Sequence, residues 1–289
     1  MAGHIVVGVD GSVPATAAAE YAAEAAARGH ATLRIVHVRE PLAGTQAWQD
    51  VDGLDAAIQQ YGEGVLAAAE RHARERAPEV EVSTRLVSGD VIERLKDEAV
   101  DADELVIGSR GMGGFAGLIL GSVSLGVAGH VPGPIVVVRE PARRAYGEIV
   151  VGFDGGPRAE AALVYAFAEA GRRSARLKVV YAWQMPAFYP FAAGYNDLLR
   201  GVFDERAAVV SEQLTPWRDK HPDVLVEEEA VCGHATHALA EASRTADLVV
   251  VGSRGLGPMG AAFLGSVGHG LLHRAHCPVA VVRSGKEER

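Results

Sequence analysis

The chain carries one glycine-rich segment twice, and this duplication limits its fold more than any other feature. Residues 108–124 read GSRGMGGFAGLILGSVS and residues 252–268 read GSRGLGPMGAAFLGSVG, an offset of 144 in a chain of 289 residues. The same offset relates Asp10 to Asp154. Solenoid repeats are about 20–50 residues long, whereas whole domains commonly have about 100–150 residues. The sequence therefore predicts two copies of one domain.

Short apolar runs alternate with helical stretches in each half. His4–Asp10 is a continuous apolar run of the kind found in strands buried on both faces, and the alanine-rich stretch after Pro14 is expected to form a helix that Gly29 ends. The other expected strands lie at residues 32–38, 80–87, 104–107 and 134–139, then 148–153, 177–182, 225–231, 248–251 and 279–283. Such alternation is typical of a parallel, doubly wound sheet. We predict an α/β fold of two tandem doubly wound domains, at 1–140 and 148–284, each with a five-stranded parallel sheet and about four helices.

The composition limits which binding partners and which cellular location fit the chain. The net charge of −9 and the pI near 5.7 argue against nucleic acid and anionic membranes as partners. No apolar run reaches the roughly 18 residues that a membrane helix needs, and the first residues do not resemble a signal peptide. The two cysteines, Cys232 and Cys277, fit reduced thiols. We expect a cytoplasmic protein.

The repeated segment has the chemistry of a phosphate-binding loop. Glycine lets the backbone approach a phosphate closely, and a helix that opens at Gly121-Ser122 would add N–H donors and a favourable dipole. Arg110 and Arg254 either add positive charge or face solvent. The segment lacks the lysine of a Walker A motif, and no dinucleotide fingerprint follows the first strand.

These residues resemble the universal stress protein family in its tandem form, whose ATP-binding signature is Gly-x2-Gly-x9-Gly-(Ser/Thr). Gly108, Gly111 and Gly121-Ser122 match it, and the second half repeats the match. The openings VVGVDGS and VVGFDGG and the ending HCPVAVVR are also similar to that family. The resemblance implies that the strand-one aspartates contact the adenosine, that Val38 and Ala182 line the adenine, and that the loops hold phosphates and ribose. It also implies pairing through the fifth strands, within the chain or in a homodimer.

We therefore expect ATP, with or without Mg²⁺, to bind once in each half. In the first half the expected binding residues are Gly8, Asp10, Val38, Gly108, Ser109, Arg110, Gly111, Gly113, Gly121, Ser122, Val123 and Ser124. In the second half they are Gly152, Asp154, Ala182, Gly252, Ser253, Arg254, Gly255, Gly257, Gly265, Ser266 and Val267.

The two halves differ at two hydroxyls. Ser12 is replaced by Gly156, and Ser124 is replaced by Gly268. If these hydroxyls bind a phosphate or its metal ion, the second site is weaker by about 0.5–1.5 kcal/mol for each lost hydrogen bond.

Several other readings stay open at this point. The glycines could serve only a tight turn, and the aspartates could be ordinary helix N-terminal residues. His273, His276 and Cys277 suggest a metal cluster, but their first-half equivalents are Gly129, Pro132 and Gly133, which favours an incidental role. The aromatic stretch Trp183–Tyr195 is either a lid, a contact surface or a loop packed on its own domain.

The leading functional hypothesis is an ATP-binding regulator or sensor of the universal stress class that acts on an unknown protein partner in stress or growth arrest. The alternative is a slow ATPase or phosphoryl-transfer enzyme, although no separate base or acceptor pocket is visible in the sequence. A third hypothesis is an interaction scaffold whose loops bind nothing.

Overall fold

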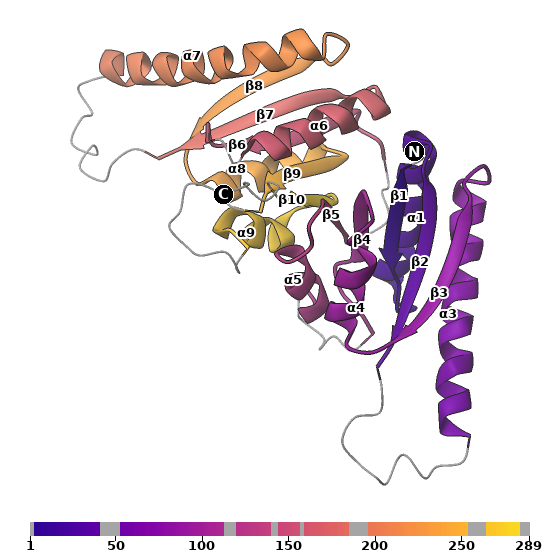
Figure 1. Ribbon diagram of the computed structural model, residues 1–289. Coiled ribbons are helices and arrows are strands. Elements are labelled where there is room, and N and C mark those ends of the chain that lie inside the picture. The colour runs from indigo at the N-terminus through magenta and orange to yellow at the C-terminus, as the bar shows by residue number, and fades with distance from the viewer. Residues whose placement is uncertain are drawn as a thin grey trace, which may run out of the picture. The chain divides into compact units, whose positions relative to one another are not determined.

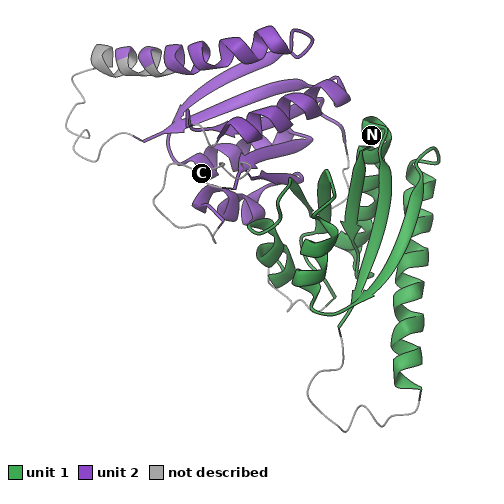
Figure 2. Cartoon of the chain, viewed as in Figure 1, with its two compact units in different colours: residues 1–143 green, residues 144–289 purple. Residues whose placement is uncertain are grey.

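The computed structural model describes residues 3–40, 53–112, 120–139, 144–156, 159–184, 196–253 and 264–283. The chain forms two compact units, residues 1–143 and residues 144–289, coloured green and purple in Figure 2. Each unit is described by itself below.

The first unit is a five-stranded sheet with helices on both faces (Figure 1). Its strands are β1 (His4–Gly8), β2 (Thr32–Arg39), β3 (Val82–Ser88), β4 (Glu104–Gly108) and β5 (Ile135–Val138), in the order β3-β2-β1-β4-β5, and every pairing is parallel. Its helices are α1 (Val13–Gly29), α3 (Leu54–Arg76), α4 (Val91–Glu98) and α5 (Ser122–Ala128). Helices α1 and α3 pack against each other, as do α4 and α5.

The second unit repeats this topology. Its elements are β6 (Glu148–Phe153), α6 (Glu160–Arg173), β7 (Arg176–Trp183), α7 (Asn196–Lys220), β8 (Val226–Cys232), α8 (Ala235–Ala242), the 3₁₀ helix η3 (Ser243–Thr245), β9 (Leu248–Gly252), α9 (Ser266–Arg274) and β10 (Val279–Val282). The strand order β10-β9-β6-β7-β8 corresponds to that of the first unit, and these pairings are parallel too. The predicted tandem α/β fold is confirmed.

The strands owe their position to continuous apolar runs. Every residue of β5 and of β10 is buried, as are the central valines of β1 and β9. Helices on both faces of a parallel sheet leave no face for polar side chains in these inner strands, whereas the outer strands β3 and β8 carry polar and partly exposed residues. Burial of this surface, at about 25 cal/mol per Å², is the main force that holds each unit together.

Helix α1 starts and ends at positions that affect the site. Ser12 is its N-cap, with Ser12 Oγ accepting a hydrogen bond from Ala15 N–H at 3.3 Å, so Asp10 is not a capping residue. The helix was expected to run to about Arg28, with Gly29 just past its end. It runs one residue further, to Gly29, and His30 takes the left-handed conformation with φ of 50°. Ser174 does the same after α6, with φ of 49°.

The topology creates a crevice at one end of each sheet. In the first unit β1 pairs with β2 on one side and with β4 on the other. The chain therefore moves outward from β1 through β2 to β3, then returns to the opposite side of β1 as β4. In open parallel sheets, ligands bind beyond the carboxyl ends of the strands at such a switch point. The loops after β1 and β4 meet there.

Candidate functional site

Asp10 connects the two loops at the switch point of the first unit. Its Oδ1 accepts a hydrogen bond from Ser12 N–H at 3.0 Å, and its Oδ2 accepts one from Met112 N–H at 2.7 Å. Ser12 follows β1 and Met112 follows β4, so one carboxylate holds both loops. Hydrogen bonds to a charged acceptor are stronger than neutral ones, at about 1.5–3 kcal/mol each.

Gly108 and Gly111 are required by the fold itself. A Cβ on Gly108 would lie 2.8 Å from Pro14 C and 2.9 Å from Ala15 N, both backbone atoms of the first turn of α1. A Cβ on Gly111 would lie 2.4 Å from Asp10 Oδ2. These two glycines let β4 and its loop approach α1 and Asp10 closely, so their presence does not by itself indicate a ligand.

Gly121 is different, because none of the described residues of the first unit excludes a side chain there. Its φ is −81°, and a Cβ would come no closer than 3.6 Å to an atom of a described residue. Those nearest atoms are Arg110 Cα and Ser109 O, with Gly111 N at 3.8 Å. A side chain on Gly121 would therefore cover the backbone of the glycine loop. Gly121 N–H donates to Ser109 O at 2.8 Å, which closes the base of the loop.

Two hydroxyls brace this loop from inside the domain. Ser12 Oγ donates to Arg110 O at 3.2 Å. Ser124 is 2% exposed, and its Oγ donates to Gly108 O at 2.8 Å and lies 3.3 Å from Ser109 O. Both hydroxyls thus support loop carbonyls. Ser122 opens α5 without a side-chain capping bond, since Gly121 is the N-cap.

The remaining expected residues of the first unit lie around this centre. Ser109 is buried and its N–H donates to Val138 O at 2.7 Å, whereas Arg110 and Ser122 are exposed. Val123 and Val38 are half-buried, with Val38 near the end of β2. Gly8 has a packing role, because a Cβ there would lie 2.9 Å from Leu95 Cδ2 of α4.

The second unit repeats the backbone contacts. Asp154 Oδ1 accepts from Gly156 N–H at 2.9 Å, Ser253 N–H donates to Val282 O at 2.7 Å, and Gly265 N–H donates to Ser253 O at 2.8 Å. Gly252 ends β9 as Gly108 ends β4.

The other second-unit candidates are placed as in the first unit, so far as the structure describes them. A Cβ on Gly152 would lie 2.9 Å from Leu239 Cδ1. Ala182 and Val267 are half-buried, and Ser266 is exposed. Four expected residues lie outside the described part of the chain: Gly113, Arg254, Gly255 and Gly257. The same holds for residues 185–195 of the aromatic stretch.

Comparisons with known proteins agree with this duplicated architecture. Residues 1–139 and residues 145–283 each match the Universal stress protein family. The protein is 32% identical over 299 residues to universal stress protein Rv1996 of Mycobacterium tuberculosis, which covers 96% of this chain and 94% of the relative. It is 32% identical over 295 residues to Rv2005c of the same organism, with 96% of each chain covered.

The chain belongs to the universal stress protein family. The fold is also similar to the crystal structure of a universal stress protein from Archaeoglobus fulgidus, with a TM-score of 0.70, 20% identity and 98% of each chain covered. Because the match spans nearly the whole of both chains, the tandem arrangement is shared by that universal stress protein.

Sequence reasoning missed two contributors to the first site of this universal stress protein. Tyr61 of α3 donates its hydroxyl to Asp10 O at 3.3 Å, and Met112 supplies the N–H that binds Asp10. Tyr61 is 51 residues from Asp10 in sequence and belongs to no recognised motif. Only the packing of α3 beside the end of β1 brings it to the site, so no pattern in the sequence could have indicated it.

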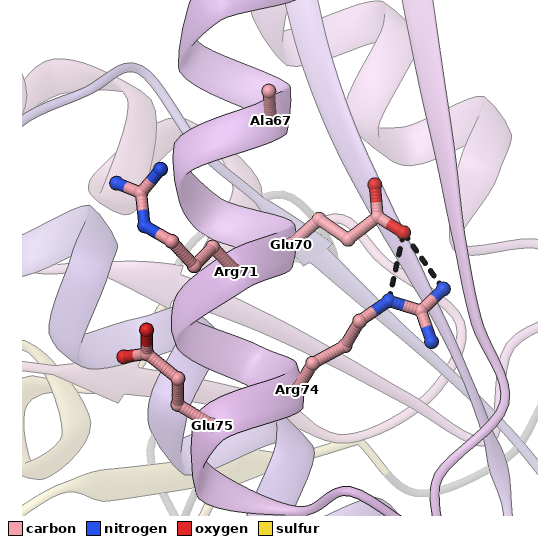
Figure 3. A pocket seen from close by; sticks show the side chains of 5 residues that line it. All are labelled: Ala67, Glu70, Arg71, Arg74 and Glu75. Atoms are coloured by element: carbon pink, nitrogen blue, oxygen red, sulfur yellow. Dashed lines mark hydrogen bonds and ion pairs between the residues drawn. The ribbon is translucent and has the colours of Figure 1, made fainter.

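Two surface hollows in the first unit lie elsewhere. The one in Figure 3 is lined by five residues of α3 alone, Ala67, Glu70, Arg71, Arg74 and Glu75. Arg74 donates to Glu70 Oε1 there, at 2.7 and 2.9 Å. The other hollow is lined by residues of β2, β3 and α4, where Glu98 pairs with Arg34 at 3.3 Å and Arg85 at 2.8 Å. Both hollows are lined mainly by charged side chains, several of which pair with one another within the domain.

The histidines and cysteines do not form a metal centre in the residues that the structure describes. No three His, Cys, Asp or Glu side chains gather as metal ligands in that part of the chain. His269 and His273 lie ring to ring on α9, with centroids 4.9 Å apart. Burial, with a contribution from the Asp247 charge, raises the pKa of the Cys277 thiol to about 12, so this cysteine stays protonated and unreactive.

Among the described residues, no helix is both long enough and apolar enough to cross a lipid bilayer.

Proposed function

We propose that this universal stress protein binds ATP, one nucleotide in each domain, and acts as a regulator or sensor in stress or growth arrest. The observation that carries the proposal is the meeting of the Asp10 carboxylate and the glycine loop at the switch point of a parallel sheet. In the second domain Asp154 likewise accepts a hydrogen bond from the residue two positions on, and Gly265 N–H closes the base of the loop, which supports a second site of the same design.

Gly121 supports a phosphate ligand in particular. The fold demands glycine at 108 and 111 but not at 121, where a Cβ would meet only ordinary contacts over the loop backbone. A bound phosphate is a reason to keep that surface clear, because backbone N–H groups can then reach its oxygens. The residues present therefore fit an anionic group. Mg²⁺ would arrive with the phosphates of the nucleotide, which are its usual ligands.

The first test uses Gly121→Ala, with Gly265→Ala for the second domain. Each variant places a methyl group over its loop, so we expect ATP affinity at the altered site to fall at least tenfold in isothermal titration calorimetry. Gly64→Ala is the matched control, because Gly64 lies exposed in α3 with no atom within 4 Å of its Cβ position. Gly64→Ala should bind ATP like the unaltered protein.

Absence of nucleotide binding would overturn the proposal. If the unaltered protein binds neither ATP nor AMP at millimolar concentration and carries no nucleotide on purification by mass spectrometry, it is not an ATP-binding protein. Release of ADP at a steady rate, raised by an acceptor, would instead favour the enzymatic alternative.

The regulatory role follows from thermodynamic linkage. A ligand that binds one conformation selectively stabilises it, so ATP would change the stability and the partner surface of each domain. We place this action in the cytoplasm, where free cysteines such as Cys232 and Cys277 stay reduced. The protein partner is to be sought by comparing what the protein captures with and without ATP, and a homodimer by sedimentation under the same two conditions.

A further inference from the structure

We propose that Tyr61 is the platform on which the adenine base of ATP stacks in the first site, and that this ring makes the first site the tighter of the two. The inference rests on the proposed function, since it names the residue that would recognise the base once ATP is bound. It is drawn from the position of Tyr61 above the end of β1.

Tyr61 is held in place by the first unit itself. Its hydroxyl donates to Asp10 O at 3.3 Å and lies 3.3 Å from the Cβ position of Gly11. Its ring meets the edge of His37 with centroids 6.2 Å apart. His37 is buried, and its Nδ1 is bound to Val9 O at 2.7 Å, so it gives the tyrosine ring a rigid support. A ring fixed in advance loses little conformational entropy when a ligand binds.

Much of the ring nevertheless remains open. Tyr61 is 51% exposed, and two apolar residues of the segments that Asp10 joins are also exposed, Val13 at 75% and Met112 at 65%. Val13 follows Ser12, whose N–H binds Asp10 Oδ1, and Met112 N–H binds Asp10 Oδ2. Exposed apolar residues on segments that meet at one polar side chain are typical of a binding site. We call Val13, Tyr61 and Met112 the apolar rim.

The apolar rim suits a flat aromatic ligand with a phosphate tail. The glycine loop starts at the same aspartate, through Met112, so a nucleotide whose phosphates lie on the loop would place its base within reach of the rim. Stacking of a base on an aromatic side chain contributes about 1–3 kcal/mol and does not depend on hydrogen bonds to the base. The loop alone would not distinguish ATP from inorganic triphosphate, whereas the ring would.

The second unit has a polar group where the first has this ring. The atom nearest to the Cβ position of Gly155 is Gln213 Oε1, at 3.2 Å. Gln213 belongs to α7, the counterpart of α3. The residue at the sequence offset of Tyr61 is Glu205, which is also exposed and not aromatic. The atoms of described residues within 4 Å of the Gly155 Cβ position all belong to Gln213, so no aromatic ring takes the place there that the Tyr61 hydroxyl takes at Gly11.

The experiment compares ATP with sodium tripolyphosphate, in the full-length chain carrying Gly265→Ala so that the first site is titrated alone. Tyr61→Leu should weaken ATP binding roughly tenfold, which corresponds to about 1.4 kcal/mol of stacking. It should leave the affinity for tripolyphosphate within about twofold. Tyr61→Phe and Tyr61→Trp keep an aromatic ring and should keep ATP affinity within about threefold. Tyr146→Leu removes a tyrosine of similar exposure, 43%, in the other unit and serves as the control.

Each outcome decides one claim. If the unaltered protein binds ATP and Tyr61→Leu binds it equally well, the platform is overturned and the proposed function stands. If Tyr61→Leu loses ATP and tripolyphosphate to the same extent, the residue acts through the loop and the platform is again overturned. If the unaltered protein binds neither ligand, the proposed function itself falls. Should Tyr61→Leu unfold, Tyr61→Gln, measured by the same titration, supplies the non-aromatic side chain, and Tyr61→Phe against the unaltered protein isolates the hydroxyl contact to Asp10 O.

Discussion

The two units keep the same backbone contacts around the glycine loop but differ in the side chains that support it. The loop base is closed at 2.8 Å in both, by Gly121 N–H to Ser109 O and by Gly265 N–H to Ser253 O. The hydroxyl braces of the first unit have no counterpart, since Gly156 and Gly268 occupy their places. The two units thus share the main-chain closure and the aspartate contact after the first strand, and differ in the hydroxyls that support the loop.

The helices on one face of each sheet show a second difference. In the first unit α1 and α3 pack through small residues, with Ala23 and Ala73 both fully buried. At the same offsets the second unit has Phe167 and Trp217, whose rings stack with centroids 5.9 Å apart and planes inclined by 15°. In the second unit Gln213, a residue of α7, lies over Gly155, the glycine that follows β6.

The largest effect is expected from removing that aromatic stack. Phe167 is 1% exposed, so Phe167→Ala should destabilise the second unit by about 3–5 kcal/mol, since it replaces a buried ring with a methyl group and leaves a cavity. Urea unfolding followed by tryptophan fluorescence measures this, because Trp217 stacks on Phe167. Val164→Ala on the same helix, at a 50% exposed position, should cost less than about 0.5 kcal/mol. Equal losses for both variants would show that the buried ring does not stabilise the second unit in this way.

An intermediate effect is expected from Glu169, a buried carboxylate of the second unit with alanine at its first-unit position. Burial acts to raise its pKa, but Arg173 and Arg172, both hydrogen-bonded to it at 2.9 Å, outweigh burial and hold the pKa below its ordinary value of 4.5. A lowered folded-state pKa means that the pair stabilises the protein above pH 4.5 and that this contribution is lost as the pH falls further.

Glu169→Gln should therefore cost about 2 kcal/mol at pH 7, less than for a fully buried pair because Arg172 is half exposed. The difference from the unaltered protein should shrink when urea unfolding is repeated below pH 4. Glu24→Gln, which removes a more exposed partner of Arg28 in the first unit, should cost less than about 1 kcal/mol. A pH-independent loss for Glu169→Gln would contradict the assignment.

The smallest effect is expected from exchanging the hydroxyl braces. Ser124→Ala removes the bond to Gly108 O and should cost about 1 kcal/mol of stability, with a several-fold loss of ATP affinity at the first site. The reverse change, Gly268→Ser, should recover less than this, because a Cβ at Gly268 lies only 3.2 Å from Leu264 Cδ1. Thermal unfolding with and without ATP measures both. A gain from Gly268→Ser as large as the loss from Ser124→Ala would mean that the two loops accept the brace equally.

Periodicity and the offset of 144 were sufficient to predict the tandem α/β fold and its parallel strands. The predicted ends of the helices and strands were less accurate. The strand expected at residues 80–87 is Val82–Ser88, because Val80 N–H instead bonds to Ala77 O in the turn after α3. The first strand ends at Gly8 rather than Asp10, since the Asp10 carboxylate turns the chain by binding Ser12 N–H. Local hydrogen bonds of this kind leave no trace in hydrophobic periodicity.

The sequence pattern identified the residues of the motif but not the separate structural role of each. The pattern marks Gly108, Gly111 and Gly121 alike, but only the structure shows that packing demands the first two and leaves the third clear. It also shows that Ser124 directs its hydroxyl inward to a strand carbonyl. That the expected residues bind ATP stays a prediction. Tyr61 could not be predicted from the sequence, because its position depends on how α3 packs.

The closed base of each loop allows the loop sequence to differ between the two domains while the domain fold stays the same. Ser109 and Gly121 are joined directly, so the strand before the loop and the helix after it are kept together by a bond that uses only main-chain atoms. The intervening letters have already diverged, with Phe115 and Ile119 in one copy against Met259 and Phe263 in the other. Because this bond uses no side chain, the residues between its two ends can change without breaking it. The same closed base therefore carries two different loop sequences within one chain.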